Sequence, residues 1–220
     1  MELDERLLEE IISRVMREIN YRSEKLSKNN QKLNYKSVFE EIGIAKPSVD
    51  VKEVVVGIGP AFGITLHKTL SGLSHVDVLK EVLAGIEEEG MTPRVVRVTR
   101  SSDVAYMANQ VAKLSGSGIG IGIQSKGTAV IHQKDLYPLT NLELFPQAPS
   151  ITLDIYRQIG KNAARYAKGE VVTPIVIPND LTVRPKYQVK AALMQIKETE
   201  LVDRDGQFIE ISTTFQKGSA

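Results

Sequence analysis

The chain has 220 residues, which is enough for one substantial hydrophobic core. Lysine and arginine number 28 against 27 for aspartate and glutamate, so the net charge of +1 gives no reason to expect nucleic acid or an anionic membrane as a partner. The absence of cysteine excludes disulfides, thiolate nucleophiles and thiolate metal ligands, and it agrees with a reducing cytoplasm.

Residues 1–19 show the periodicity of an amphipathic helix. Apolar residues from Leu3 to Ile19 recur at three- and four-residue steps between charged residues. Residues 20–50 follow as a predicted linker, because their first part is polar, rich in lysine and nearly without periodicity. A short isolated helix is marginal in water, so we expect residues 1–19 either to dock on a partner or to fold back on their own domain.

Residues 51–202 form the predicted core domain, in which strands and helices alternate. Strands are predicted over 53–58, 94–98, 118–123 and 129–133. Helices are predicted over 74–90, 101–114, 151–168 and 186–198. This alternation predicts an α/β fold with a Rossmann-like, mainly parallel, doubly wound sheet. The C-terminal tail, residues 203–220, has a mixed pattern and receives no assignment.

The predicted strand over 118–123 alternates glycine with isoleucine. In a strand, every isoleucine then points to one side of the sheet, and Gly120 and Gly122 leave bare backbone on the other. Interior glycines weaken a strand, and their usual reason is the close approach of another backbone or a ligand. We therefore expect Gly120 and Gly122 either to contact a ligand or to serve packing between sheet and helix.

Two charged residues follow predicted strands, and for Asp103 the position is one where α/β sheets bind ligands, at the end of a parallel strand and the start of the next helix. Asp103 lies in the first turn of a predicted helix, where an acidic residue can also serve only to complement the helix dipole. Lys126 lies between Ser125 and Gly127, which leave room around its stem. Its ammonium group can donate to phosphate or carboxamide oxygens, and the alternative is an exposed loop lysine.

Other ligand-binding patterns are poorly matched. Gly57, Gly59 and Gly63 follow a strand as in a dinucleotide fingerprint, but Phe62 stands at the third glycine position and Pro60 removes a backbone donor. The chain contains neither the GxxxxGK[ST] of a P-loop nor the GxSxG of a serine hydrolase. Its three scattered histidines match no zinc spacing, so no metal site is expected.

Five segments taken together resemble the medium subunit of adenosylcobalamin-dependent diol dehydratase, with the glycerol dehydratase medium subunit as the near alternative. They are GPAFG, SSDVA, LSGSGIGIGIQSKGTAVIHQ, NLELFPQAP and YRQIGKNAARYA, in collinear order within residues 54–202. The opening MELDERLLEEIISRVMREI is similar to the extension by which this subunit, in the propanediol-utilising kind, enters a bacterial microcompartment. The lysine- and asparagine-rich linker departs from the alanine, proline or glycine expected there.

The resemblance implies a subunit of a lyase that converts 1,2-propanediol to propionaldehyde, and glycerol to 3-hydroxypropionaldehyde, by a radical mechanism. It implies large and small partner subunits in a dimer of heterotrimers, with a reactivating factor as a further partner. The coenzyme, adenosylcobalamin, would be shared with the large subunit, which carries catalysis. The expected location is the cytoplasm, within a microcompartment whose shell or core proteins bind residues 1–19. The pocket that separates propanediol from glycerol lies on another chain.

By motif, the resemblance places no catalytic residue on this chain and assigns it a role in holding the coenzyme. Asp103 and Lys126 match positions that bond the polar side groups or nucleotide tail of the corrin. Leu139, Asn141 and Pro146 match the apolar loop that lines the nucleotide end. No histidine here lies in DxHxxG, the motif with which other cobalamin proteins replace the lower base of the coenzyme, so the lower base is expected to be retained.

Two other functions compete with this interpretation. The small subunit of the dehydratase reactivating factor has a similar fold and releases damaged coenzyme, but the intact IQSKG and NLELFPQ segments argue against it. A nucleotide-dependent oxidoreductase would have to bind NAD or FAD.

Overall fold

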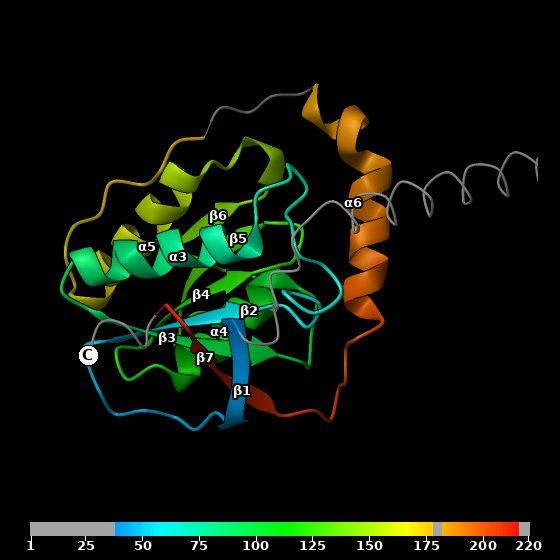
Figure 1. The fold of residues 1–220 in the computed structure, drawn as a ribbon. Helices are drawn as coiled ribbons and strands as arrows, with labels where there is room; N and C mark the ends of the chain where they lie inside the picture. The colour runs from blue at the N-terminus through cyan, green and yellow to red at the C-terminus, as the bar shows by residue number, and fades with distance from the viewer. Residues whose placement is uncertain (1–37, 178–181, 216–220) are drawn as a thin grey trace, which may run out of the picture. The chain divides into compact units, whose positions relative to one another are not determined.

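The computed structural model describes residues 38–177 and 182–215, so the predicted helix over 1–19 lies outside the described residues. Within these ranges the chain forms a seven-stranded sheet with the order β1-β7-β3-β2-β4-β5-β6 (Figure 1). The strands are β1 Phe39–Ile44, β2 Glu53–Ile58, β3 Thr92–Val98, β4 Ile119–Ile123, β5 Ala129–Gln133, β6 Glu143–Phe145 and β7 Phe208–Thr213. The helices are α3 His75–Glu88, α4 Val104–Leu114, the 3-10 turn η1 Ala148–Ser150, α5 Leu153–Ala167 and α6 Val183–Thr199. None of the described helices is long and apolar enough to cross a membrane.

The α/β fold class was predicted, but a mainly parallel sheet is wrong. Only β3, β2 and β4 run parallel to one another, and the pairs β1–β7, β7–β3, β4–β5 and β5–β6 are antiparallel. The physical reason is that β4, β5 and β6 follow each other without an intervening helix. Consecutive strands joined by short connections pair antiparallel, whereas a parallel pair needs a long crossover.

The sheet also takes in two segments that the sequence left outside the core. Strand β1 lies in the predicted linker 20–50, and β7 lies in the unassigned tail. The two pair with each other, and β7 also pairs with β3. Arg94 of β3 fixes this join, because its guanidinium donates three bonds of 2.6–2.9 Å to the carboxylate of Glu210 on β7. The linker prediction is therefore wrong for the residues of β1.

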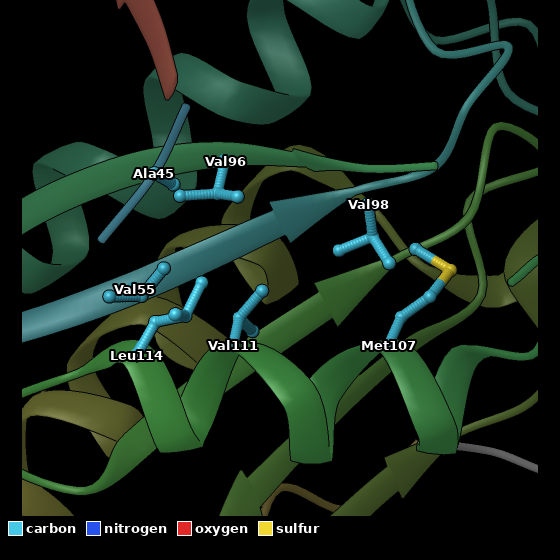
Figure 2. Packing of buried hydrophobic residues seen from close by; sticks show 7 residues of the cluster. All are labelled: Ala45, Val55, Val96, Val98, Met107, Val111 and Leu114. Carbon is cyan, nitrogen blue, oxygen red and sulfur yellow. The ribbon is translucent and has the colours of Figure 1, made fainter. Parts of the chain in front are cut away.

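Helices cover both faces of the sheet. On one face α3 packs against α5, and Gly85 and Gly160 allow the close approach, since a Cβ on Gly160 would lie 2.1 Å from the Val82 carbonyl oxygen (Figure 1). The other face carries α4, which packs on β2, β3, β4 and β5. Figure 2 shows the core on this face, made of Ala45, Val55, Val96, Val98, Met107, Val111 and Leu114.

The bare face of the Gly/Ile strand lies against α4. A Cβ on Gly122 would lie 2.7 Å from the Val104 carbonyl oxygen, and one on Gly120 would lie 2.5 Å from the Ala112 nitrogen. Both neighbours are helix backbone, so these glycines let α4 sit close to β4. Of the two expectations for Gly120 and Gly122, the structure supports packing between sheet and helix. A coenzyme contact at these positions is not supported, because α4 fills the space.

Candidate functional site

The carboxyl ends of β2 and β4 mark the point where the crossovers of the parallel strands diverge, and we call this place the crevice. From β2 the chain crosses through α3 to β3 on one side, and β4 pairs with the other side of β2. The crossovers run over opposite faces, because α3 and α4 lie on different sides of the sheet. The space beyond β2 and β4 is thus a topological switch point, the usual ligand site of an open α/β sheet. The residues at this place are the loop after β2, which begins at Gly59, and the loop Gln124–Gly127 after β4.

The loop after β4 is fixed on several sides. His75, the first residue of α3, contacts the Ser125 carbonyl oxygen through Nε2 at 2.8 Å and accepts the Gly63 N–H through Nδ1 at 3.1 Å. This pair of bonds defines a neutral imidazole with its proton on Nε2, and burial lowers the pKa of His75 to about 3. Further along, the Tyr156 hydroxyl donates to the Gly127 carbonyl oxygen at 2.6 Å. The backbone that carries Lys126 is therefore held from the sheet side.

Helix α6 approaches the same loop from the other side and inserts Glu198 into the crevice. The Ser125 N–H lies 3.1 Å and 3.0 Å from the two carboxyl oxygens of Glu198, and the Ser125 hydroxyl donates to Oε1 at 2.8 Å. Glu198 is fully buried, and burial raises its pKa to about 7 against the lowering effects of Ser125, Lys126 and Arg97. A Cβ on Gly59 would lie 1.8 Å from Glu198 Oε1, so the carboxyl group can occupy this place only beside a glycine.

Lys126 is half-buried beside this carboxyl group. Its Nζ donates to Gln195 Oε1 at 3.1 Å, and Gln195 lies almost one turn before Glu198 on α6. Burial lowers the pKa of Lys126, and the charges of Glu198 and Asp103 oppose this shift. Among the described residues Gln195 is the one hydrogen-bond acceptor of the ammonium group, which has three donors. Two donors thus remain for a ligand.

Asp103 forms the N-cap of α4, one or two residues after the serines predicted to cap this helix. Its Oδ1 accepts the Tyr106 N–H at 2.8 Å, and its charge acts on Lys126. Ser102, the preceding residue, receives a bond of 3.1 Å from Gln195 Nε2 and accepts from the Gln124 side chain through its carbonyl oxygen. The structure thus joins Asp103 and Lys126 in one polar cluster, and Asp103 caps its helix as well.

The predicted site residues of the apolar loop lie at opposite ends of the strands. Pro146 follows β6, whose Phe145 pairs with Ala129 at the start of β5, so Pro146 lies at the end of the sheet that carries Lys126. Leu139 and Asn141 precede β6 and lie toward the other end, where β5 finishes. The Leu139 side chain is 84% exposed and Asn141 is half-buried. Leu139 and Asn141 are therefore not brought to the cluster around Lys126.

Sequence reasoning missed the four residues that complete the cluster: Arg97, Ser125, Gln195 and Glu198. Arg97 is almost fully buried and donates to the carbonyl oxygens of Gly59 at 3.2 Å and Phe62 at 2.8 Å, which shapes the loop after β2. One signal was present in the sequence. Tyr187, Ala191 and Met194 form the inner stripe of α6, and Glu198 continues it at helical spacing, where a charged residue is unexpected.

The fold and this crevice define an open α/β domain with a polar cluster, fixed by hydrogen bonds, at the carboxyl ends of β2 and β4. Among the described residues, no group of three or more histidine, aspartate or glutamate side chains could hold a metal ion. Comparison with known proteins gives the family of this domain. Residues 59–173, more than half of the chain, match the family described as dehydratase medium subunit. The chain belongs to the dehydratase medium subunit family.

Solved structures with similarity to this chain include two reactivating proteins. A glycerol dehydratase reactivase shares 19% sequence identity, with a TM-score of 0.45, and the match covers 58% of this chain and 96% of that chain. A diol dehydratase-reactivating factor, solved with ADP and Mg²⁺, shares 26% identity, with a TM-score of 0.41, over 60% of this chain and 98% of that chain.

Proposed function

We propose that this chain is the medium subunit of an adenosylcobalamin-dependent diol dehydratase and that it holds and orients the coenzyme for a large subunit that carries catalysis. The observation that carries the proposal is that Lys126 lies at the switch point of the sheet, bonded to Gln195 and within the electrostatic influence of Asp103, in a chain of the dehydratase medium subunit family. When bound, adenosylcobalamin would supply the radical chemistry that converts 1,2-propanediol to propionaldehyde or glycerol to 3-hydroxypropionaldehyde.

The donor set of the crevice fits such a coenzyme. The amide groups at the corrin periphery both donate and accept hydrogen bonds, and the nucleotide tail carries a phosphate. Lys126 has two N–H donors left for oxygen acceptors, and Asp103 Oδ2 has no hydrogen-bond partner among the described residues and can accept an N–H. Gln124 Oε1 is buried and also lacks a partner among these residues. These groups bind and orient, which is a positioning role.

Reconstitution tests the function directly. The purified chain alone should have no dehydratase activity, and addition of the large and small subunits should give activity that depends on added coenzyme. We expect a dimer of heterotrimers. Dehydratase activity of this chain by itself would contradict the proposal. Release of cobalamin from the assembled complex, in place of stable retention, would favour the small subunit of the reactivating factor.

Coenzyme affinity tests the two charged residues. Lys126→Ala should weaken coenzyme binding by about 1.5 to 3 kcal/mol, the loss expected for one charge-assisted hydrogen bond. Lys113→Ala is the matched control, because Lys113 is exposed near the end of α4. Asp103→Asn keeps a good N-cap and removes only the charge, so it should lower affinity without lowering the melting temperature. Unchanged affinity in both variants would indicate that Asp103 and Lys126 have structural roles only.

The N-terminal residues form a separate part of the proposal. Deletion of residues 1–20 should leave activity nearly unchanged, raise solubility and abolish association with microcompartment shell or core proteins. Loss of activity in this deletion would indicate instead that the predicted helix packs on the enzyme core. The substrate preference between propanediol and glycerol should follow the large subunit when large subunits of the two kinds are exchanged.

A further inference from the structure

Helix α6 contacts the rest of the domain through a few of its side chains. Over residues 185–199 of the helix most side chains are exposed, including Val189 at 72% and Ile196 at 55%, and Met194 and Glu198 are the buried ones. An apolar contact forms where Met194 meets Leu70. Polar contacts come from Lys190, Gln195, Glu198 and Thr199, which bond Leu70, Lys126, Ser125 and Ser102 respectively. Among these four polar side chains, only Glu198 is fully buried.

Glu198 and Gln195 form hydrogen bonds with successive residues of one short loop. Glu198 takes both donors of Ser125, the backbone N–H and the hydroxyl, at 2.8–3.1 Å. Gln195, three residues earlier on the same helix, takes the ammonium group of the next residue, Lys126, at 3.1 Å. The bond to Gln195 thus links the Lys126 side chain to α6, and Glu198 is the buried polar contact that links the same helix to this loop.

We propose that Glu198 is a positioning residue for coenzyme binding: it docks α6 in the crevice between β2 and β4 and thereby fixes the orientation of Lys126. This inference rests on the proposed function, because it assigns Glu198 an effect on the affinity of the coenzyme. Glu198 itself is buried under α6 and does not touch the coenzyme. Its effect passes through Ser125 and Gln195 to the ammonium group.

Gly59 gives an independent way to displace the carboxyl group. A methyl group on Gly59 would lie 1.8 Å from Glu198 Oε1 and 2.9 Å from its carboxyl carbon, and the three nearest heavy atoms all belong to this side chain. The end of a flexible side chain can move, whereas backbone cannot move without wider rearrangement. Gly59→Ala should therefore expel Glu198 and leave the rest of the loop after β2 in place.

The test is a double-mutant cycle on coenzyme affinity in the assembled complex. Glu198→Gln keeps the volume of the side chain and should weaken coenzyme binding about threefold to tenfold, less than loss of the Lys126 bond itself. In a Lys126→Ala background, Glu198→Gln should have no further effect, because its influence passes through Lys126. Gly59→Ala should reproduce both results. Glu200→Gln, an exposed neighbour two residues along the chain, is the matched control and should bind coenzyme like the unchanged protein.

A second readout does not involve the coenzyme. Hydrogen exchange of the Ser125 amide in the full chain should become faster in Glu198→Ala and Gly59→Ala, since this amide loses its acceptor, and stay unchanged in Glu200→Gln. Additive losses of affinity in the cycle, or an unchanged Ser125 amide, would overturn the inference. Failure of the unchanged complex to bind coenzyme would instead overturn the proposed function, so the two failures are distinguishable.

Discussion

The buried carboxyl group of Glu198 should make the stability of the domain depend on pH near neutrality. Its pKa is raised to about 7 in the folded chain by burial, whereas the ordinary value is 4.5. The folded state therefore binds the proton more tightly than the unfolded state. Stability from this group is fully present below about pH 4.5 and is lost as the pH rises through about 7. Glu198→Gln cannot ionise and should lose this dependence.

The size of the effect follows from the two pKa values. A gap of about 2.5 pH units, at about 1.4 kcal/mol per unit, corresponds to about 3 kcal/mol between acidic and alkaline conditions. Glu198 is fully buried, so solvent does not screen the effect. His75 acts in the opposite direction, because its pKa is lowered to about 3 and its contribution is lost as the pH falls below about 6.5. The pH-dependent contributions of Glu198 and His75 to the free energy of unfolding therefore partly cancel.

The difference between the unchanged chain and Glu198→Gln isolates the carboxyl group from His75. Urea unfolding of the two full-length chains at several values from about pH 5 to about pH 8 gives this difference. As the pH falls, we expect the free energy of unfolding of the unchanged chain to rise relative to that of the variant. The slope should be near 1.4 kcal/mol per pH unit between about pH 5 and pH 7. Glu200→Gln should show no such slope. A flat difference between the unchanged chain and Glu198→Gln would refute the reasoning.

Three substitutions test the packing that supports the crevice. Tyr156→Phe should cost about 1 to 3 kcal/mol in urea unfolding, because the Gly127 carbonyl oxygen loses its buried donor. Gly160→Ala should cost about 1 to 3 kcal/mol by driving α5 away from α3, while Gln158→Ala on the exposed side of α5 should be nearly neutral. Gly122→Ala should cost a similar amount by displacing α4, and an unchanged melting temperature would contradict that packing.

The elements that the sequence predicted well are those specified by local pattern. Helices α3 and α5 begin after Ser74 and Thr152, whose side chains cap them, and α4 follows Asp103 in the same way. Each such helix carries its start signal within a few residues. Strands β1 and β7 were missed for the opposite reason: Phe39 pairs with Thr213 at the far end of the chain. No local pattern contains a partner that distant in sequence.

The Gly/Ile strand shows how far a single pattern can be interpreted. Alternating glycines predicted that something bulky approaches one face of β4, and this is confirmed. The identity of the neighbour was encoded elsewhere, in the small residues Ala108 and Ala112 of α4, which stand four residues apart and meet Gly122 and Gly120. A close helix contact needs small residues on both partners. Only the fold brings these two patterns together.

The candidate site was predictable where it follows strand ends and not where it depends on α6. Asp103 follows β3 and Lys126 follows β4, so a parallel arrangement of β3, β2 and β4 was enough to bring them to the same end of the sheet. Glu198 comes from a helix about 70 residues further along, and no periodicity indicates which edge of a sheet such a helix covers.

In the proposed function, the cluster positions the coenzyme and carries no reaction step. Ser125 is held through its carbonyl oxygen by His75 and through its N–H and hydroxyl by Glu198, so the backbone that precedes Lys126 has little freedom. The ammonium group of Lys126 bonds Gln195 on the same helix, so a coenzyme bound by Lys126 would be linked to α6. Changes that loosen α6 should therefore appear as weaker coenzyme binding, with the turnover of the fully loaded enzyme unchanged.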